Sequence, residues 1–163
     1  MTITTDFHGT ASIATTSLIS RIAAPASATL GEIADTALRV VVGLFLVPHG
    51  AQKLFGAFGG HGLEATGQFF ETQLGFWNGF LAALAAGSVE TFGGLALALG
   101  LATRPVAIMI AVMLAVAASV HIGAGFFWTN GGWEYAVFWA VAAAVFAVKG
   151  GGRFSLDALI ARR

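Results

Sequence analysis

Long apolar stretches alternate with short polar segments over most of this chain. A helix needs about 20 mainly apolar residues to cross the hydrocarbon core of a bilayer. Four stretches approach or meet that length, at residues 33–50, 77–101, 105–122 and 133–148. Open sheet edges would leave backbone groups unpaired in lipid, so these stretches predict helices rather than strands. We therefore expect an all-α integral membrane protein built as a bundle of four transmembrane helices.

Two shorter segments carry the apolar spacing of helices that lie in the membrane interface. In the connection 51–76, Leu63, Phe70 and Leu74 recur at helical spacing opposite polar positions. A run of three glycines ends the fourth stretch, and Ser155 after it is an N-cap candidate for a second short helix. The sequence therefore predicts short interfacial helices beside the bundle.

The first thirty residues differ from the rest of the chain. Ser and Thr interrupt every apolar run there, and no basic residue precedes Arg21, so the segment does not resemble a cleaved signal. We assign residues 1–30 to an N-terminal cytoplasmic tail without a defined role, and residues 31–163 to the membrane domain.

Composition indicates that lipid is the main solvent of the folded chain. Hydrophobic residues make up 57% of the sequence and charged residues 10%, whereas soluble domains carry roughly 25% charged residues. The formal net charge is zero, which argues against a nucleic-acid partner. With no Cys, the chain has no disulfide, thiolate ligand or thiol nucleophile, so any redox role would depend on a bound cofactor.

The basic residues are distributed asymmetrically about the predicted spans. With four spans, both tails and the loop at Arg104 lie on one side of the membrane. Of the eight Lys and Arg residues, only Lys53 lies on the other side. The first side holds Arg21, Arg39, Arg104, Lys149, Arg153, Arg162 and Arg163. The positive-inside rule then places both termini in the cytoplasm, and we expect a multi-pass protein of the bacterial inner membrane.

Ionisable residues inside a span are costly, which makes them candidates for function. Glu90 lies about 16 Å from the inner end of its span at 1.5 Å per residue, on a stripe of small residues formed by Ala82, Ala86, Gly94 and Ala98. Arg39, near the inner end of the first span, is a counter-ion candidate. A structural Arg39–Glu90 ion pair is one interpretation, and a proton-relaying or ligand-binding Glu90 is the alternative.

A second polar group is predicted near the outer face. His49 and His121 end two helices that run outward, Glu134 opens the fourth span, and Lys53 follows His49 by one turn. Three interpretations stay open: interfacial anchors, a quinone site in which His donates to a carbonyl oxygen, or haem or metal ligation by the two imidazoles. Two isolated His without local ligand spacing are a weak metal signal, so we assign no metal site.

Several motifs occur in order along the chain. They are Arg39-Val40-Val41-Val42-Gly43, His49-Gly50-Ala51-Gln52-Lys53, Glu90 with Gly93-Gly94, Gly132-Trp133-Glu134-Tyr135, and Gly150-Gly151-Gly152-Arg153 followed by Ser155-Leu156-Asp157. Over roughly residues 33–159 the chain thereby resembles the DoxX family of small four-helix membrane proteins. That resemblance implies subunits of quinol oxidases or thiosulfate:quinone oxidoreductases, or membrane components of oxidative-stress assemblies. By that resemblance, the candidate functional residues are Arg39, His49, Lys53, Glu90, His121 and Glu134.

Together these observations predict a membrane subunit of a quinone-linked electron-transfer complex. We expect it to bind a quinone or quinol near the outer face and to receive electrons from a protein partner. One alternative is a non-catalytic membrane scaffold that anchors or assembles a partner enzyme. Another is a small-solute or proton pathway along Glu90 and the two His, which with four spans would require a homo-oligomer.

Overall fold

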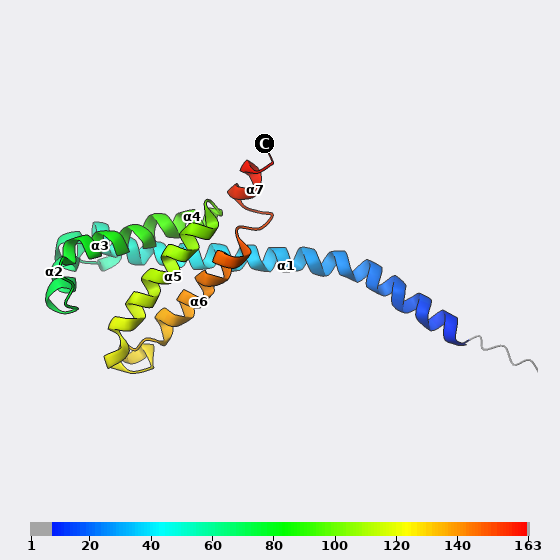
Figure 1. Ribbon diagram of the computed structural model, residues 1–163, viewed down its shortest axis with the longest axis horizontal. Helices are drawn as coiled ribbons and strands as arrows, with labels where there is room; N and C mark the ends of the chain where they lie inside the picture. Colours follow the sequence, from blue (N-terminus) through cyan, green and yellow to red (C-terminus); the bar gives the residue numbers. More distant parts are fainter. Residues whose placement is uncertain (1–7, 163) are drawn as a thin grey trace, which may run out of the picture. The chain divides into compact units, whose positions relative to one another are not determined.

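The computed structural model describes residues 8–162 of the backbone, and side chains from residue 28 onward. Within these residues the protein is helical with no strand, which confirms the all-α class (Figure 1). The α-helices are α1 (His8–Phe55), α2 (Gly62–Thr72), α3 (Gly79–Ser88), α4 (Gly94–Leu99), α5 (Thr103–Val120), α6 (Glu134–Lys149) and α7 (Leu156–Ile160). A π turn, η2 (Val89–Gly93), joins α3 to α4, and 3-10 turns lie at η1 (Ala57–Gly59), η3 (Ile122–Ala124) and η4 (Trp128–Asn130).

The chain divides into two compact units, the first ending at Asp35 and the second beginning at Thr36. Helix α1 contains the boundary between these units, and the predicted division into a tail and a membrane domain near residue 30 stays a prediction. Residues 1–7 of the predicted tail lie outside the described residues. The core and the candidate site both belong to the second unit.

Two helical stretches of the described chain are long and apolar enough to cross a membrane, by length and composition. They are Gly79–Leu99, which runs through α3, the π turn and α4, and Thr103–Val120, which is α5. They coincide with the second and third predicted spans. Helix α6 and the C-terminal part of α1 occupy the other two predicted stretches, and the crossing of the bilayer by these two helices stays a prediction.

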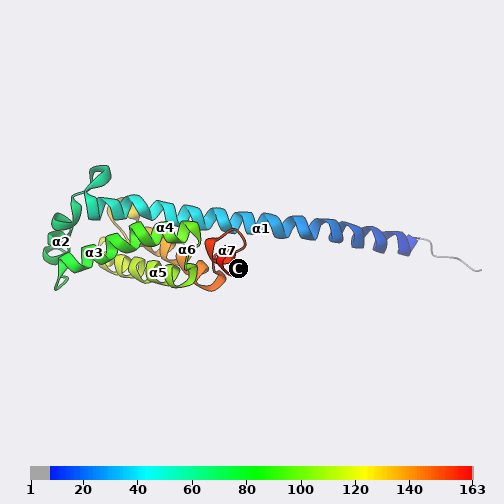
Figure 2. The same ribbon diagram turned by 90° about the horizontal axis from the view of Figure 1, so that it is seen from above.

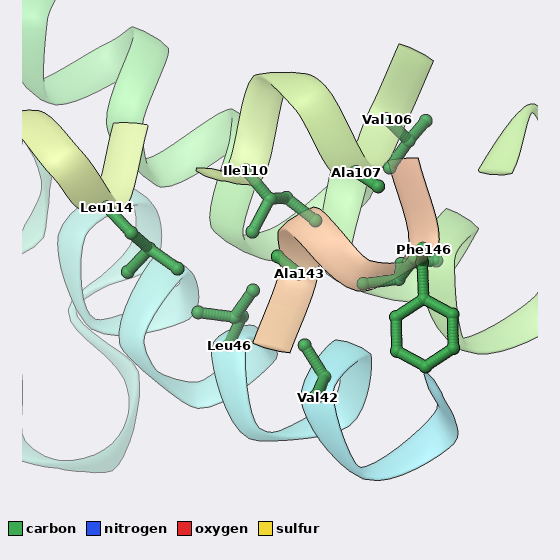
Figure 3. Close-up of a cluster of buried hydrophobic side chains, with 9 residues drawn as sticks. Val42, Leu46, Val106, Ala107, Ile110, Leu114, Ala143 and Phe146 are labelled. Atoms are coloured by element: carbon green, nitrogen blue, oxygen red, sulfur yellow. The ribbon is translucent and has the colours of Figure 1, made fainter. Parts of the chain in front are cut away.

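One buried cluster joins four helices of the second unit. Val42 and Leu46 from α1 meet Ile110 of α5 and Phe146 of α6 (Figure 3). Leu97, Val106, Ala107, Leu114 and Ala143 complete the cluster. Large apolar side chains on the same helices, including Phe45, Ile108 and Phe138, are exposed. An apolar perimeter around an apolar core is expected of a protein whose outer surface faces lipid.

Glycines set the close approach of α1 to the α3–α4 stretch. Gly50 lies against Gly87 and Thr91, and a Cβ on Gly50 would come within 2.6 Å of the Gly87 carbonyl oxygen. Gly43 lies in the same way against Gly94 and Ala98. The two helices therefore run antiparallel with small residues in the seam, as helices packed in lipid require.

The predicted small-residue stripe needs one correction. Gly94 and Ala98 are buried in α4 as expected. In α3, however, the buried positions are Gly79, Ala83 and Gly87 rather than Ala82 and Ala86. The π turn adds one residue to the helical repeat, so the face that packs inward shifts by one position on crossing it.

The short helices lie at the two ends of the bundle. Helix α2 and the α5–α6 loop lie at the end where α1 finishes, and α7 lies at the other end beside the α4–α5 turn (Figures 1 and 2). Both helices were predicted from the sequence. Ser155 caps α7, since its hydroxyl accepts a hydrogen bond from the Ala158 N–H at 3.1 Å.

Candidate functional site

A buried ion pair joins the end of α1 to the π turn. Nζ of Lys53 donates hydrogen bonds to both carboxylate oxygens of Glu90, at 2.7 and 2.9 Å. Glu90 is only 6% exposed, and its carboxylate therefore requires a charged partner. Lys53 reaches it from the last turn of α1, with its flexible stem half-buried and its ammonium also bonded to the His49 carbonyl at 3.3 Å.

The π turn concentrates polar side chains on the face that meets α1. It places Glu90 and the adjacent Thr91 in the interior together. Thr91 Oγ1 is buried and has no hydrogen-bond partner among the described residues, and it lies beside Gly50. Single π turns inside α-helices occur frequently at functional sites, which makes this segment the strongest candidate in the chain.

His49 lies at the exposed edge of the same group. It precedes Lys53 by one helical turn, its side chain is exposed, and it interacts electrostatically with Glu90. One turn earlier on α1, Phe45 contacts Trp139 of α6 with ring centroids 5.6 Å apart. The face of α1 thus carries an aromatic ring, an imidazole and an ammonium group on successive turns.

The predicted Arg39–Glu90 ion pair is corrected by these contacts. The Arg39 guanidinium donates instead to the carbonyl oxygens of Leu97 and Ala98, at 2.7 and 2.6 Å, and of Phe154 at 2.7 Å. The last carbonyls of α4 carry the negative end of its dipole, and the Leu97 carbonyl accepts from the Gly100 N–H at 3.0 Å as well as from Arg39. Arg39 therefore joins α1 to the end of α4 and to the segment before α7.

Asp157 completes this junction, and sequence analysis gave it no role. Its carboxylate accepts hydrogen bonds from the N–H groups of Ala102 and Thr103, at 2.7 and 2.8 Å, and from Thr103 Oγ1 at 2.7 Å. Burial alone would raise the pKa of Asp157, but the bonds from Thr103 and Ala102 and the charge of Arg39 outweigh it and lower the pKa below its ordinary value. The donors lie 54 and 55 positions earlier in the chain, at the start of α5, so the spacing around Asp157 in the sequence could not have paired them.

The residues predicted to form one polar group near the outer face lie in separate places in the structure. His49, Lys53 and Glu90 lie together, whereas Glu134 begins α6 and accepts a hydrogen bond from the Trp128 N–H at 3.0 Å. His121 is exposed at the end of α5, and no side-chain hydrogen bond within residues 28–162 joins it to either group. No three metal-ligating side chains converge within the described part of the chain.

An open surface cavity of ≈ 430 Å³ lies beside Glu134, and most of the rings that line it are also exposed on the surface. Its lining combines residues of the α5–α6 loop with the first turns of α6: Phe126, Trp128, Trp133, Glu134, Tyr135, Val137 and Phe138. Six of these seven side chains are aromatic or aliphatic, so the cavity presents ring faces and a single carboxylate.

Comparison with known proteins is consistent with the sequence motifs. A family model described as DoxX matches residues 34–124. The matched segment includes Arg39, His49, Lys53, Glu90 and His121, whereas Glu134 lies beyond it. No curated protein and no solved structure matches this chain.

Proposed function

The chain belongs to the DoxX family of membrane proteins, and from that premise we propose that it is a quinone-binding membrane subunit of an electron-transfer complex. The observation that carries the proposal is the exposed imidazole of His49 next to the buried Lys53–Glu90 pair. An accessible hydrogen-bond donor backed by a buried carboxylate is the arrangement that proton-coupled chemistry requires.

The residues present fit a quinone head group, which is a flat ring with carbonyl oxygens at its edge. Phe45 and Trp139 supply an aromatic wall, with their ring planes inclined at 46°. His49 follows Phe45 by one turn of α1 and supplies a donor to a carbonyl oxygen. Phe45 is 54% exposed on the apolar perimeter, so a lipid-soluble ring reaches this wall laterally from the bilayer.

Each polar residue then has a distinct task. When bound, a quinone supplies the exchange of two electrons and two protons. His49 would donate a hydrogen bond to one carbonyl oxygen and would hold the proton that is exchanged at that atom. Glu90 would exchange a proton with the buried side of the site, and Lys53 holds its carboxylate in position through two hydrogen bonds.

The proposal includes a partner and a membrane topology. Because the chain has no Cys, the electrons come from a partner subunit that carries its own redox centre. Four spans with cytoplasmic termini in a bacterial inner membrane place His49 and Lys53 toward the outer face, in accordance with the asymmetric distribution of Lys and Arg. The quinone site then opens to the outer leaflet.

The test is direct binding of a short-tailed quinone analogue to purified protein in detergent. We expect the analogue to raise the melting temperature of the wild-type protein, and His49→Ala to weaken its affinity by roughly tenfold, the effect of about 1.4 kcal/mol. His121→Ala is the matched control, because it removes an exposed imidazole at the end of another helix. Equal affinity of the wild-type and His49→Ala proteins would refute the site, and an intact partner complex that binds no analogue would favour the scaffold interpretation.

A further inference from the structure

The cavity between the α5–α6 loop and α6 adjoins the aromatic wall of the proposed quinone site, because Trp139 contacts Tyr135 and Phe138 of the lining with ring centroids 5.9 and 5.7 Å apart. Its chemistry is nevertheless its own. Its walls are ring faces, and Glu134 is the one charged residue among those that line it. The quinone proposal uses neither this carboxylate nor the loop aromatics.

Backbone hydrogen bonds within the α5–α6 loop fix the conformation of the segment that forms the cavity walls. The N–H groups of Trp133 and Glu134 donate to the carbonyls of Gly125 and Phe126, both at 3.1 Å. The Gly132 N–H donates to the Phe127 carbonyl at 2.9 Å. A Cβ on Gly132 would come within 2.5 Å of the Phe126 backbone, so only glycine allows the two sides of the loop to close. The walls are therefore organised before a ligand arrives, which lowers the entropy cost of binding.

Two aromatic pairs line the cavity, one within the loop and one between the loop and the first turn of α6. Phe126 and Trp133 meet edge to face, with centroids 5.0 Å apart and planes at 90°. Trp128 and Tyr135 lie 6.1 Å apart with planes inclined at 38°. The faces of such rings carry negative potential, and they attract cations that are weakly hydrated.

Glu134 adds a full negative charge to these ring faces. Its Oε1 accepts from the Trp128 N–H, which fixes the carboxylate against the loop. Its Oε2 accepts no hydrogen bond from any residue in the described part of the chain, and it is available to a ligand. One carboxylate surrounded by rings is a poor site for Mg²⁺ or Ca²⁺, which require several oxygen ligands.

We propose that this cavity binds an organic ammonium group, either in the head group of a zwitterionic phospholipid or in a soluble amine. The cation lies against the faces of Trp128 and Tyr135 and forms a charge-assisted contact with Glu134. Val137 and Phe138, which extend the lining along α6, offer an apolar surface to the chain attached to a lipid head group. Aromatic residues at a membrane interface commonly lie at head-group level.

Choline tests the ammonium chemistry without a lipid. Isothermal titration calorimetry of the full chain in a maltoside detergent, which has no ammonium group, is expected to give saturable binding of choline and none of its neutral carbon isostere. Glu134→Gln keeps an acceptor for the Trp128 N–H but removes the charge, and we expect it to weaken choline binding by roughly tenfold. Glu64→Gln, a change at an exposed carboxylate of α2, is the matched control and is expected to bind as the wild type does.

The aromatic contribution has its own matched pair of variants. Trp128→Leu is expected to weaken choline binding severalfold, whereas Trp77→Leu, at a side chain that is 90% exposed outside the cavity, leaves it unchanged. His49→Ala also leaves it unchanged, which separates this site from the proposed quinone site. Equal binding of choline and its isostere, wild-type affinity in Glu134→Gln, or the absence of saturable choline binding would each overturn the proposal.

Nanodiscs identify the source of the ammonium group. We expect the wild-type protein to melt at a higher temperature in phosphatidylcholine than in phosphatidylglycerol, with a smaller difference in Glu134→Gln. That result assigns the site to a lipid head group. Choline binding without a lipid-dependent difference still supports the ammonium site and assigns it to a soluble amine.

Discussion

Nζ of Lys53 lies 2.7 Å from Oε2 of Glu90, and this contact links two residues 37 positions apart in the sequence. Glu90 is buried among helices whose perimeter is apolar. A charge in such surroundings is stable only with a partner. The pair therefore determines how the end of α1 lies on the π turn, and it supplies the first prediction.

Removing one member of this pair should cost more than removing both charges. Lys53→Met leaves Glu90 buried without a counter-ion, and we expect a loss of roughly 3 kcal/mol in the free energy of unfolding. The double variant Lys53→Met with Glu90→Gln leaves no uncompensated charge and should recover much of that loss. Denaturant unfolding in detergent measures the wild type, the two single variants Lys53→Met and Glu90→Gln, and the double variant. Additive effects in this double-mutant cycle would contradict direct coupling of the two side chains.

The seam between α1 and the α3–α4 stretch should not tolerate a methyl group at Gly50. A Cβ there would come within 2.6 Å of the Thr91 nitrogen and the Gly87 oxygen, so Gly50→Ala should destabilise the protein by about 1–3 kcal/mol. Gly31→Ala is the control in the same helix, because a Cβ at Gly31 meets nothing within 4 Å. Thermal unfolding should show a lower midpoint for Gly50→Ala alone.

Arg39 should hold the C-terminal segment on the bundle. Its guanidinium bonds three backbone carbonyls, including that of Phe154, and the single ammonium of Lys cannot reproduce that planar arrangement. Arg39→Lys should therefore expose the segment around α7, observed as faster hydrogen exchange there than in the wild type. Arg104→Lys, at an exposed position in the first turn of α5, should leave the exchange unchanged, and equal protection in both variants would refute the role of Arg39.

Asp157 should make the stability of this junction depend on pH. Its pKa is lowered in the folded protein by hydrogen bonds and by Arg39, despite the opposing effect of burial. A lowered folded-state pKa contributes stability above the pKa of the unfolded chain, and that contribution disappears as the pH falls through the folded-state pKa. The wild type should therefore exceed Asp157→Asn in stability at neutral pH.

The measurement is the unfolding midpoint of both proteins across the acid range. The difference between them should shrink as the pH falls below about 4, the ordinary pKa of an Asp carboxyl. Glu64→Gln, which removes an exposed carboxyl group from α2, serves as the charge control. A difference between wild type and Asp157→Asn that stays constant with pH would show that ionisation of Asp157 does not support the junction.

Local chemistry allowed the sequence to predict the helix boundaries in the C-terminal half of the chain, whereas α1 begins at His8 and not near residue 33 as predicted. Pro105 lies in the first turn of α5, the glycine run follows α6, and the Ser155 hydroxyl caps α7. These signals act over a few residues and need no knowledge of the neighbouring helices. The π turn has no such local signal, and it was missed.

The partner of Glu90 could not be predicted because it depends on the register between two helices. Arg39 and Lys53 lie on one helix, about 21 Å apart at 1.5 Å per residue. Because small residues recur along the neighbouring helix, the sequence is compatible with several registers, in which Glu90 lies near one or the other of them. In the structure Gly43 faces Gly94 and Gly50 faces Gly87. In that register the end of α4 lies opposite Arg39, and Glu90 lies within hydrogen-bond distance of Lys53.

The sequence predicted which residues form the candidate site better than it predicted how their side chains lie relative to one another. His49 and Lys53 follow each other by one helical turn, so spacing alone placed them on one face. Glu134 and His121 lie near helix ends, and the loop between α5 and α6 decides where their side chains point. Backbone bonds such as that from Trp133 to Gly125 define this loop, and hydropathy contains no information about them.

Two buried threonines should respond oppositely to the loss of their hydroxyl groups. Thr91 Oγ1 has no partner within the described residues, whereas Thr103 Oγ1 donates to Asp157 at 2.7 Å. Valine has nearly the same shape as threonine, so Thr91→Val removes only a desolvated hydroxyl and should leave stability unchanged or raise it by up to about 1 kcal/mol. Thr103→Val should lower stability by about 1–3 kcal/mol, because it breaks a hydrogen bond to a charged group. Denaturant unfolding in detergent compares the two. If Thr91→Val were as destabilising as Thr103→Val, the Thr91 hydroxyl would have a partner in the folded protein, such as a buried water molecule shared with Glu90.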